Sequence, residues 1–107
     1  FQGVPTMYSA LLILAGDVAP EAIASLRTCV SGGASLPVQV LSDFENAYGC
    51  AILEGYGLSE TSPVASFNHP DRPRKAGSIG TPVQGVEMRV VDPSGAEVAQ
   101  GESGEIQ

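Results

Sequence analysis

Two short stretches rich in glycine carry the residue types that could bind a nucleotide. The first runs from Gly55 to Thr61 and places Tyr56 between two glycines, followed by Ser59 and Glu60. Glycine lets a ligand approach the backbone, an aromatic ring offers a stacking face, a hydroxyl can bond a phosphate oxygen, and a carboxylate can hold Mg²⁺. The same pattern also suits a tight turn before a helix cap, so both interpretations stay open on residue types alone.

The second stretch, Ser31–Ser35, has the same two interpretations. Its small residues could admit the edge of a purine ring against the backbone, or they could form the turn that begins the next helix. Neither stretch contains the Gly-Lys-Ser/Thr sequence of a Walker A loop, so phosphate binding of that kind is excluded.

The remaining reactive side chains favour no second chemistry. His69 is the only histidine and lies in a polar, proline-rich stretch without a catalytic partner in a motif, which predicts a surface histidine rather than a general base. Cys29 and Cys50 lie in apolar stretches without CxxC spacing. They are predicted to be buried, reduced thiols, which indicates a cytoplasmic setting.

Apolar spacing predicts the elements that position the two stretches. Apolar residues recur every three or four positions over 7–16 and 35–49, which predicts two helices. Buried strands are predicted at 26–30 and 50–53, each followed directly by a glycine-rich loop. Because ligands collect at the carboxyl ends of parallel strands, both loops are expected to face one site of an α/β sheet.

The C-terminal third has a different pattern. Val64–Phe67 is a candidate third strand, and a polar, proline-punctuated connection follows it to Lys75. Apolar and polar residues then alternate at the start of Val86–Asp92, and Asp92–Gly95 suits a turn before Ala96–Val98. We predict an antiparallel hairpin that belongs to a different sheet.

Composition limits the classes of protein. The chain has 107 residues, a net charge of −7, and 43% hydrophobic residues. The acidic balance argues against a nucleic-acid or anionic-membrane partner, because phosphate groups need several basic contacts. The longest apolar run, Ala10–Ala15, is too short for a transmembrane segment. One small, soluble domain with a core is predicted.

Five motifs in order resemble the adenylate-forming superfamily of acyl-CoA synthetases, luciferases and peptide-synthetase adenylation domains. The motifs are Val4–Thr6, Leu26–Ala34, Glu54–Thr61, Gly77–Pro82 and Gly101–Glu105. The third motif, followed by Ser-Pro-Val, is most similar to the bacterial fatty-acyl-CoA synthetase branch. The resemblance implies part of a parallel-sheet α/β subdomain over residues 1–75, with the adenylate-binding loops. It also implies the start of a smaller, barrel-like β subdomain over 76–107.

The resemblance also implies a role for each matching position. Tyr56 is expected to stack on adenine, Ser59 to contact the α-phosphate and Glu60 to ligate Mg²⁺, so Ser59 and Glu60 are the expected catalytic residues. The other expected nucleotide-binding positions are Gly32, Gly33, Ala34, Glu54, Gly55 and Gly57. The positions expected around the acyl pocket are Val64, Gly77, Ser78, Ile79 and Gly80.

The implied activity is that of a fatty-acid–CoA ligase that uses ATP, Mg²⁺ and coenzyme A and releases AMP. The chain lacks an initiator methionine and has no counterpart of the family's phosphate loop, ribose-binding Asp, hinge or catalytic Lys. We therefore expect a piece of the large N-terminal domain that is inactive in isolation. The alternatives are an amino-acid or aryl-acid adenylating domain, and a non-catalytic module that binds nucleotide weakly or forms a homodimer through uncovered sheet edges.

Overall fold

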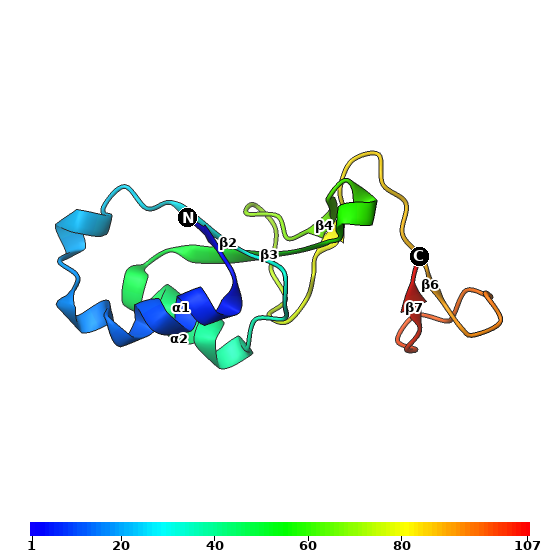
Figure 1. Ribbon diagram of the computed structural model, residues 1–107, viewed down its shortest axis with the longest axis horizontal. Helices are drawn as coiled ribbons and strands as arrows, with labels where there is room; N and C mark the ends of the chain where they lie inside the picture. Colours follow the sequence, from blue (N-terminus) through cyan, green and yellow to red (C-terminus); the bar gives the residue numbers. More distant parts are fainter.

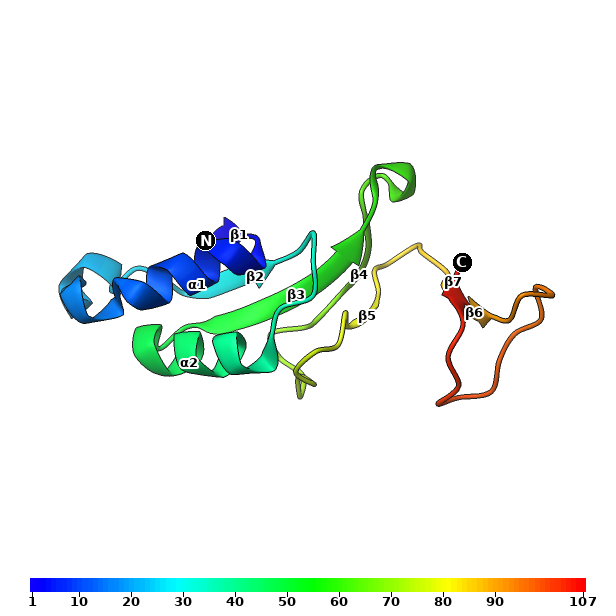
Figure 2. The ribbon, with the colours of Figure 1, turned by 60° about the horizontal axis from the view of Figure 1, so that its bottom comes forward.

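The computed structural model describes residues 1–107 and consists of a mixed sheet with two helices, followed by a separate two-stranded unit (Figures 1 and 2). The strands of the mixed sheet are adjacent in chain order. Their bounds are β1 (Gln2–Gly3), β2 (Thr28–Ser31), β3 (Ala51–Gly57), β4 (Val64–Phe67) and β5 (Thr81–Pro82). The first three strands are parallel to one another, and β4 and β5 add in antiparallel fashion.

β3 changes its mode of pairing along its length. Its first four residues pair with β2 in parallel, and Gly55–Gly57 pair with β4 in antiparallel fashion. A helical crossover joins β2 to β3, whereas only a short turn joins β3 to β4, and these connections dictate the two pairing modes. The strand predicted at 50–53 is therefore too short. Pairing with β4 keeps Gly55–Gly57 in strand conformation, although the sequence predicted a glycine loop there.

Two helices cover one face of the sheet. They are α1 (Pro5–Ile13) and α2 (Val38–Tyr48), and α2 ends at Gly49. Short 3₁₀ helices follow α1 at Ala15–Asp17 and Pro20–Ile23. The helix predicted over 7–16 therefore tightens before its end, and the helix predicted over 35–49 is confirmed within a few residues.

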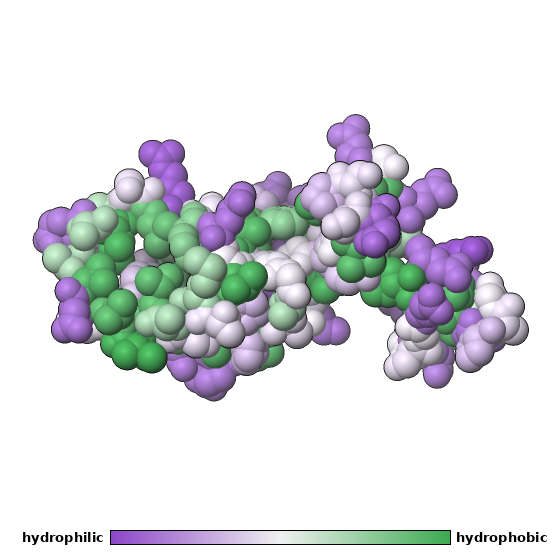
Figure 3. Space-filling model, in the orientation of Figure 1, coloured by the Kyte–Doolittle hydropathy of each residue, from purple (hydrophilic) through white to green (hydrophobic).

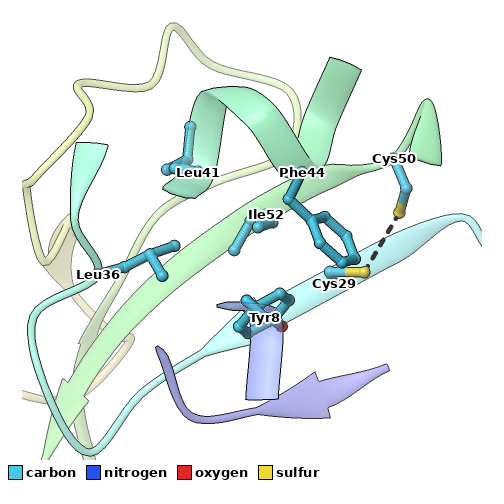
Figure 4. Close-up of a cluster of buried hydrophobic side chains, with 7 residues drawn as sticks. All are labelled: Tyr8, Cys29, Leu36, Leu41, Phe44, Cys50 and Ile52. Carbon is cyan, nitrogen blue, oxygen red and sulfur yellow. Dashed lines mark hydrogen bonds between the residues drawn. The ribbon is translucent and has the colours of Figure 1, made fainter. Parts of the chain in front are cut away.

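The core lies between these helices and β2–β3 (Figure 4). Phe44 of α2 meets the ring of Tyr8 edge to face, with centroids 5.0 Å apart, and stacks on Tyr48 at 4.4 Å. The other buried members of this cluster are Cys29, Leu36, Leu41, Cys50 and Ile52. Burying these aromatic and aliphatic side chains is the main stabilisation available to the sheet.

The two cysteines are buried free thiols, as the sequence predicts. Their sulfur atoms lie 3.5 Å apart and share a weak hydrogen bond. Burial, together with this hydrogen bond between the two thiols, raises the pKa of the Cys29 thiol to about 12. Because the thiolate is the reactive form, the Cys29 thiol is structural in the folded chain.

The C-terminal unit pairs β6 (Val90–Val91) with β7 (Glu105–Ile106) at the end of the molecule away from α1 (Figure 1). The predicted turn at Asp92–Gly95 is present, but its return strand makes only a single bridge, from Glu97 to Val91. Regular pairing falls instead on β7, whose ladder is closed by backbone bonds between Arg89 and Gln107. The predicted α/β class followed by a separate antiparallel hairpin is confirmed.

The connection between the two units runs through β5. The predicted division at residues 75 and 76 stays a prediction; β5 pairs with β4, so we propose that the boundary follows Pro82. Hydrophobic surface gathers over the end of the molecule that carries the helices (Figure 3). None of its helices is long and apolar enough to cross a membrane.

Candidate functional site

The carboxyl ends of β2 and β3 bring the two glycine stretches side by side. Ser31 is the register partner of Glu54, so Gly32–Gly33 and Gly55–Gly57 leave the parallel pair at the same edge. This is the edge at which ligands bind in parallel α/β sheets. The expected convergence of the two stretches on one place is therefore observed.

Alternation along these strands produces two sides. Cys29 and Ile52 face the helices, so Ser31 and Glu54, two residues further on, face the same way. We call the cavity on this face the helix-side cavity and the cavity on the opposite face the far-side cavity.

The helix-side cavity has a volume of about 300 Å³. The residues that line it and not the far side are Ala34, Ser35, Glu54, Gly77 and Ile79. The far-side cavity has about 290 Å³, and the residues that line it alone are Val30, Gly32, Ser59, Pro63, Val64 and Phe67. Both cavities share the strand ends themselves: Ser31, Gly33, Gly55, Tyr56, Gly57 and Leu58.

The glycines on either side of Tyr56 have a structural reason besides any ligand. A Cβ atom at Gly55 would overlap the ring of Phe67, and one at Gly57 would overlap the backbone of Pro63. The return of β4 therefore requires glycine at both positions. Tyr56 between them is half-buried and borders both cavities.

Glu54 is a buried carboxylate at the wall of the helix-side cavity. Its Oε2 accepts a hydrogen bond from the backbone N–H of Gly77 at 3.1 Å. Its carbonyl oxygen accepts hydrogen bonds from the backbone and side-chain nitrogens of Asn68, at 2.9 and 3.1 Å. These bonds fix the side chain and the backbone of Glu54 against the loop that follows β4.

The segment 77–80 brings Gly77 and Ile79 to the wall of the helix-side cavity. Asn68 Nδ2 also donates to the carbonyl of Ser78 at 2.6 Å, and Ser66 Oγ donates to the carbonyl of Ile79 at 2.9 Å. Of the positions that the resemblance assigns to the acyl pocket, Gly77 and Ile79 lie beside Ala34 and Glu54 on the helix side. Ser78 and Gly80 line neither cavity, whereas Val64 lies on the far side.

Ser59 and Glu60 lie in a short 3₁₀ helix, η3 (Ser59–Thr61). Thr61 Oγ1 accepts a hydrogen bond from Leu58 N–H at 2.9 Å and closes this turn. Ser59 borders the far-side cavity, and Glu60 is exposed beside it. No group of three or more His, Cys, Asp or Glu side chains could hold a metal. A single exposed carboxylate fits a Mg²⁺ ion that takes its remaining ligands from phosphate oxygens and water.

Ser31 begins the second candidate stretch, but no role was predicted for its side chain. Its hydroxyl is buried, borders both cavities, and is the one buried side-chain polar atom without a hydrogen-bond partner. An orphaned buried hydroxyl of this kind is destabilising unless a ligand or water satisfies it. Its position as the last residue of β2, directly before the glycines, is the signal that could have identified it.

Charged side chains beside the site form one ion pair. Arg74 donates to both carboxylate oxygens of Glu45, at 2.5 and 3.3 Å. Burial alone would raise the pKa of Glu45, but the hydrogen bonds from Arg74 and from Ile52 N–H outweigh it and hold that pKa below its ordinary value. His69, in contrast, is exposed, as predicted.

Comparisons of the sequence give a consistent family. A family model described as AMP-binding enzyme matches residues 1–107. The chain is 39% identical over 107 residues to a long-chain-fatty-acid–CoA ligase of Bacillus subtilis, which covers 99% of this chain and 19% of the relative. It is 37% identical over 105 residues to a feruloyl-CoA synthase of an Amycolatopsis species, covering 97% of this chain and 21% of that protein. The chain thus spans about a fifth of the length of these curated relatives.

Solved structures give the same result. A benzoate CoA ligase from Burkholderia xenovorans superposes with a TM-score of 0.89 at 34% identity, over 99% of this chain and 21% of that one. An anthranilate CoA ligase in complex with anthranoyl-AMP superposes with a TM-score of 0.84, also at 34% identity, over 99% of this chain and 20% of that one. The mixed sheet, the helices and the separate hairpin therefore occur together in these enzymes.

Proposed function

Because the chain belongs to the AMP-binding enzyme family, we propose that it contributes the adenylate-binding strand ends of an AMP-forming acid–CoA ligase. The observation that carries this proposal is the meeting of the two glycine stretches at the carboxyl ends of β2 and β3, between two cavities. Nucleotides and other ligands bind at this edge of parallel sheets.

The proposed reaction has two steps. The substrate carboxylate attacks the α-phosphate of ATP, and the bond to the leaving pyrophosphate breaks. The thiol of coenzyme A then gives its proton to water, its sulfur attacks the acyl carbon, and AMP leaves with the bonding electrons. Both steps require an oriented substrate and neutralisation of phosphate charge.

We assign the helix-side cavity to the nucleotide. Gly33 and Ala34 would lie along one edge of the adenine, and Tyr56 would stack on its face. Glu54 is held by Gly77 and Asn68, so it can present a fixed acceptor to the base. Ile79 adds an apolar contact on the same wall.

We assign the far-side cavity to the acid. Its lining is mostly apolar, with Val30, Val64 and Phe67 around the glycines. Such a surface suits an alkyl chain, and we propose a fatty acid as the substrate. An aromatic acid is the second candidate, because relatives of similar identity are named feruloyl-CoA synthase and benzoate–CoA ligase.

The Ser31 hydroxyl would make its missing hydrogen bond to the adenylate where the two cavities meet. Ser59 would donate to the α-phosphate from the mouth of the far side, and Glu60 would hold Mg²⁺. The metal, when bound, neutralises phosphate charge. The family resemblance and the positions of the side chains support these proposed roles.

The test is acid-dependent pyrophosphate release from ATP, measured on the protein at its natural length. The acids are palmitate, octanoate, benzoate and ferulate, each with and without coenzyme A. Release with palmitate and formation of its thioester support the fatty-acid assignment, and release with benzoate or ferulate alone replaces it with the aryl-acid candidate. No release with any acid contradicts the proposed function. Tyr56→Ala should raise the KM for ATP and leave the KM for the acid within about twofold.

A non-catalytic module that binds nucleotide weakly, or that only pairs through its sheet edges, is not favoured, because the relatives are named as ligases. Sedimentation of the chain at several concentrations tests the dimer. The cytoplasmic setting stays a prediction. Fractionation of cells that express the natural-length protein would test it.

A further inference from the structure

β3 has an unpaired edge at Ile52. The carbonyl of Glu54 bonds to Asn68 on the side of β4, so the backbone groups of Ile52, two residues earlier, point to the same side. β4 ends at Phe67, whose partner is Gly55, and no strand continues past it to Ile52. The N–H and C=O of Ile52 therefore need other partners.

Two side chains supply those partners. The N–H of Ile52 donates to Glu45 Oε1 at 2.7 Å, and Arg74 Nη1 donates to the C=O of Ile52 at 2.7 Å. Arg74 also bonds both oxygens of Glu45, so the donor and the acceptor are tied to each other. One carboxylate and one guanidinium together reproduce the pair of hydrogen bonds that a neighbouring strand would make.

The three groups come from separate parts of the fold. Glu45 belongs to α2, Ile52 to β3, and Arg74 to the connection between β4 and β5. Three residues after Arg74, the N–H of Gly77 bonds the carboxylate of Glu54 at the wall of the helix-side cavity. The connection is thus held at Ile52 immediately before it reaches the site.

We propose that Glu45 and Arg74 are positioning residues for the nucleotide cavity: they replace the missing strand at Ile52 and thereby hold Gly77 on the carboxylate of Glu54. The inference rests on the proposed function for the identity of the ligand, but not for the contacts themselves. Arg74 binds the backbone carbonyl of Ile52 and the carboxylate of Glu45 in this role.

A positioning role and a purely structural role give different kinetics. If the pair only stabilised the fold, its loss would reduce the fraction of active protein and lower kcat at an unchanged KM. If the pair holds the wall of the nucleotide cavity, its loss raises the KM for ATP while kcat stays within about twofold.

The experiment compares Arg74→Met, Arg74→Lys and Glu45→Gln in the natural-length protein, with Arg72→Met as the control. Arg72 is an exposed arginine of the same connection. Arg74→Met should raise the KM for ATP by roughly fivefold or more. Arg74→Lys should rescue only part of the effect, because lysine keeps the charge but lacks the planar fork that bonds both oxygens of Glu45. Glu45→Gln keeps an acceptor for Ile52 N–H, so its KM for ATP should lie between the values for Arg74→Lys and Arg74→Met.

Amide hydrogen exchange gives a readout that needs no activity. Arg74→Met should speed exchange at the Ile52 and Gly77 amides, and Arg72→Met should not. Faster exchange in a protein that releases no pyrophosphate with any acid would contradict the proposed function and support the positioning. Unchanged exchange at both amides, or a lower kcat at an unchanged KM, would overturn the positioning role. The Glu45→Gln, Arg74→Met double variant should be no worse than Arg74→Met, and additive effects would count against a shared role.

Discussion

The sheet region, residues 1–82, and the C-terminal unit, residues 83–107, are held together in different ways. Of the 14 buried residues, only Val91 belongs to the C-terminal unit. The sheet region encloses a cluster of aromatic and aliphatic side chains, whereas the C-terminal unit relies on backbone bonds and turns. Two-stranded units without a packed face are marginally stable in water, so most of the folding free energy must reside in the sheet region.

The difference between the two regions indicates which of them can hold a rigid site. The two cavities are bounded by strand ends that rest directly on the core, and the segment that carries Gly77 and Ile79 to the helix-side cavity is held by hydrogen bonds from Asn68 and Ser66. The C-terminal unit contributes no residue to either cavity. Local opening of that unit should therefore leave the geometry of the site unchanged.

The strongest test of this contrast is Phe44→Ala. Phe44 packs between two tyrosine rings in the core, so its truncation should lower the free energy of unfolding by about 3–5 kcal/mol. The two cysteines supply the measurement, because a thiol reagent reaches them only when the sheet region opens. Val38→Ala, at a position of α2 that is 53% exposed, is the control and should change labelling little. If the amides of Val98 and Gln107 lose protection together with the thiols in urea, the two regions unfold as one and the contrast is wrong.

The next effect locates the end of the sheet region. Gly80 has a φ of +84°, and a Cβ there would overlap the backbone of Phe67, whereas Gly85 has a φ of +86° in open space. Gly80→Ala should cost roughly 2–4 kcal/mol and Gly85→Ala about 1 kcal/mol, because only the first adds an overlap to the strain of a positive φ. Urea denaturation of both variants measures the difference. Equal losses would mean that the connection yields at Gly80 and does not belong to the sheet region.

A smaller pair of effects has opposite signs within the sheet region. Ser31→Ala removes an orphaned buried hydroxyl and should raise the free energy of unfolding by about 1 kcal/mol. Ser66→Ala removes an equally buried hydroxyl that bonds the carbonyl of Ile79, and should lower it by about 1–2 kcal/mol. Thermal or urea unfolding distinguishes the signs. A loss of stability in Ser31→Ala without ligand would show that water or a neighbour already satisfies the hydroxyl.

The smallest effect is confined to the C-terminal unit. Asp92 accepts hydrogen bonds from Ser94 and Ala96, which hold its pKa below the ordinary carboxyl value. A depressed folded pKa means that this contribution is present at neutral pH and is lost as the pH falls below about 4, through the folded pKa. The amide shifts of Ser94 and Ala96 in an NMR titration should follow this loss, and Asp92→Ala should abolish it. The amide shifts of Leu41 and Phe44 in the core should not change in the same range; a parallel change would couple the two regions.

The sequence predicted most elements of the sheet region, because its signals are local. The three-to-four spacing around Leu41 and Phe44 marks the buried face of α2, and the apolar runs near Cys29 and Ile52 mark the buried strands. The length of β3 was not predictable in this way, because the pairing of Gly55–Gly57 depends on a strand that returns after a turn. The predicted partner of β6, residues 96–98, was wrong for the same reason. That segment and β7 are both short, so no local pattern tells which of them pairs with β6.

The site was predictable in outline. Residue types placed Gly33 and Tyr56 at the ends of parallel strands, and the register confirms that these ends are adjacent. The side on which Gly77 and Ile79 lie depends on bonds from Asn68 and Ser66, which no local pattern contains. In the sequence, Arg74 is one charged residue of a polar connection. Only the distance from its Nη1 to the carbonyl oxygen of Ile52 shows that it binds the backbone.

The separate linings of the two cavities have a consequence for how such a protein can diversify. Val30, Val64 and Phe67 line the far side alone, so a substitution at one of them leaves in place the residues that line only the helix side. Under the proposed assignment, a lineage can change the acid it accepts at Val30, Val64 or Phe67 while it inherits the surface that meets ATP. A library randomised at those three positions samples new substrates on a constant nucleotide site.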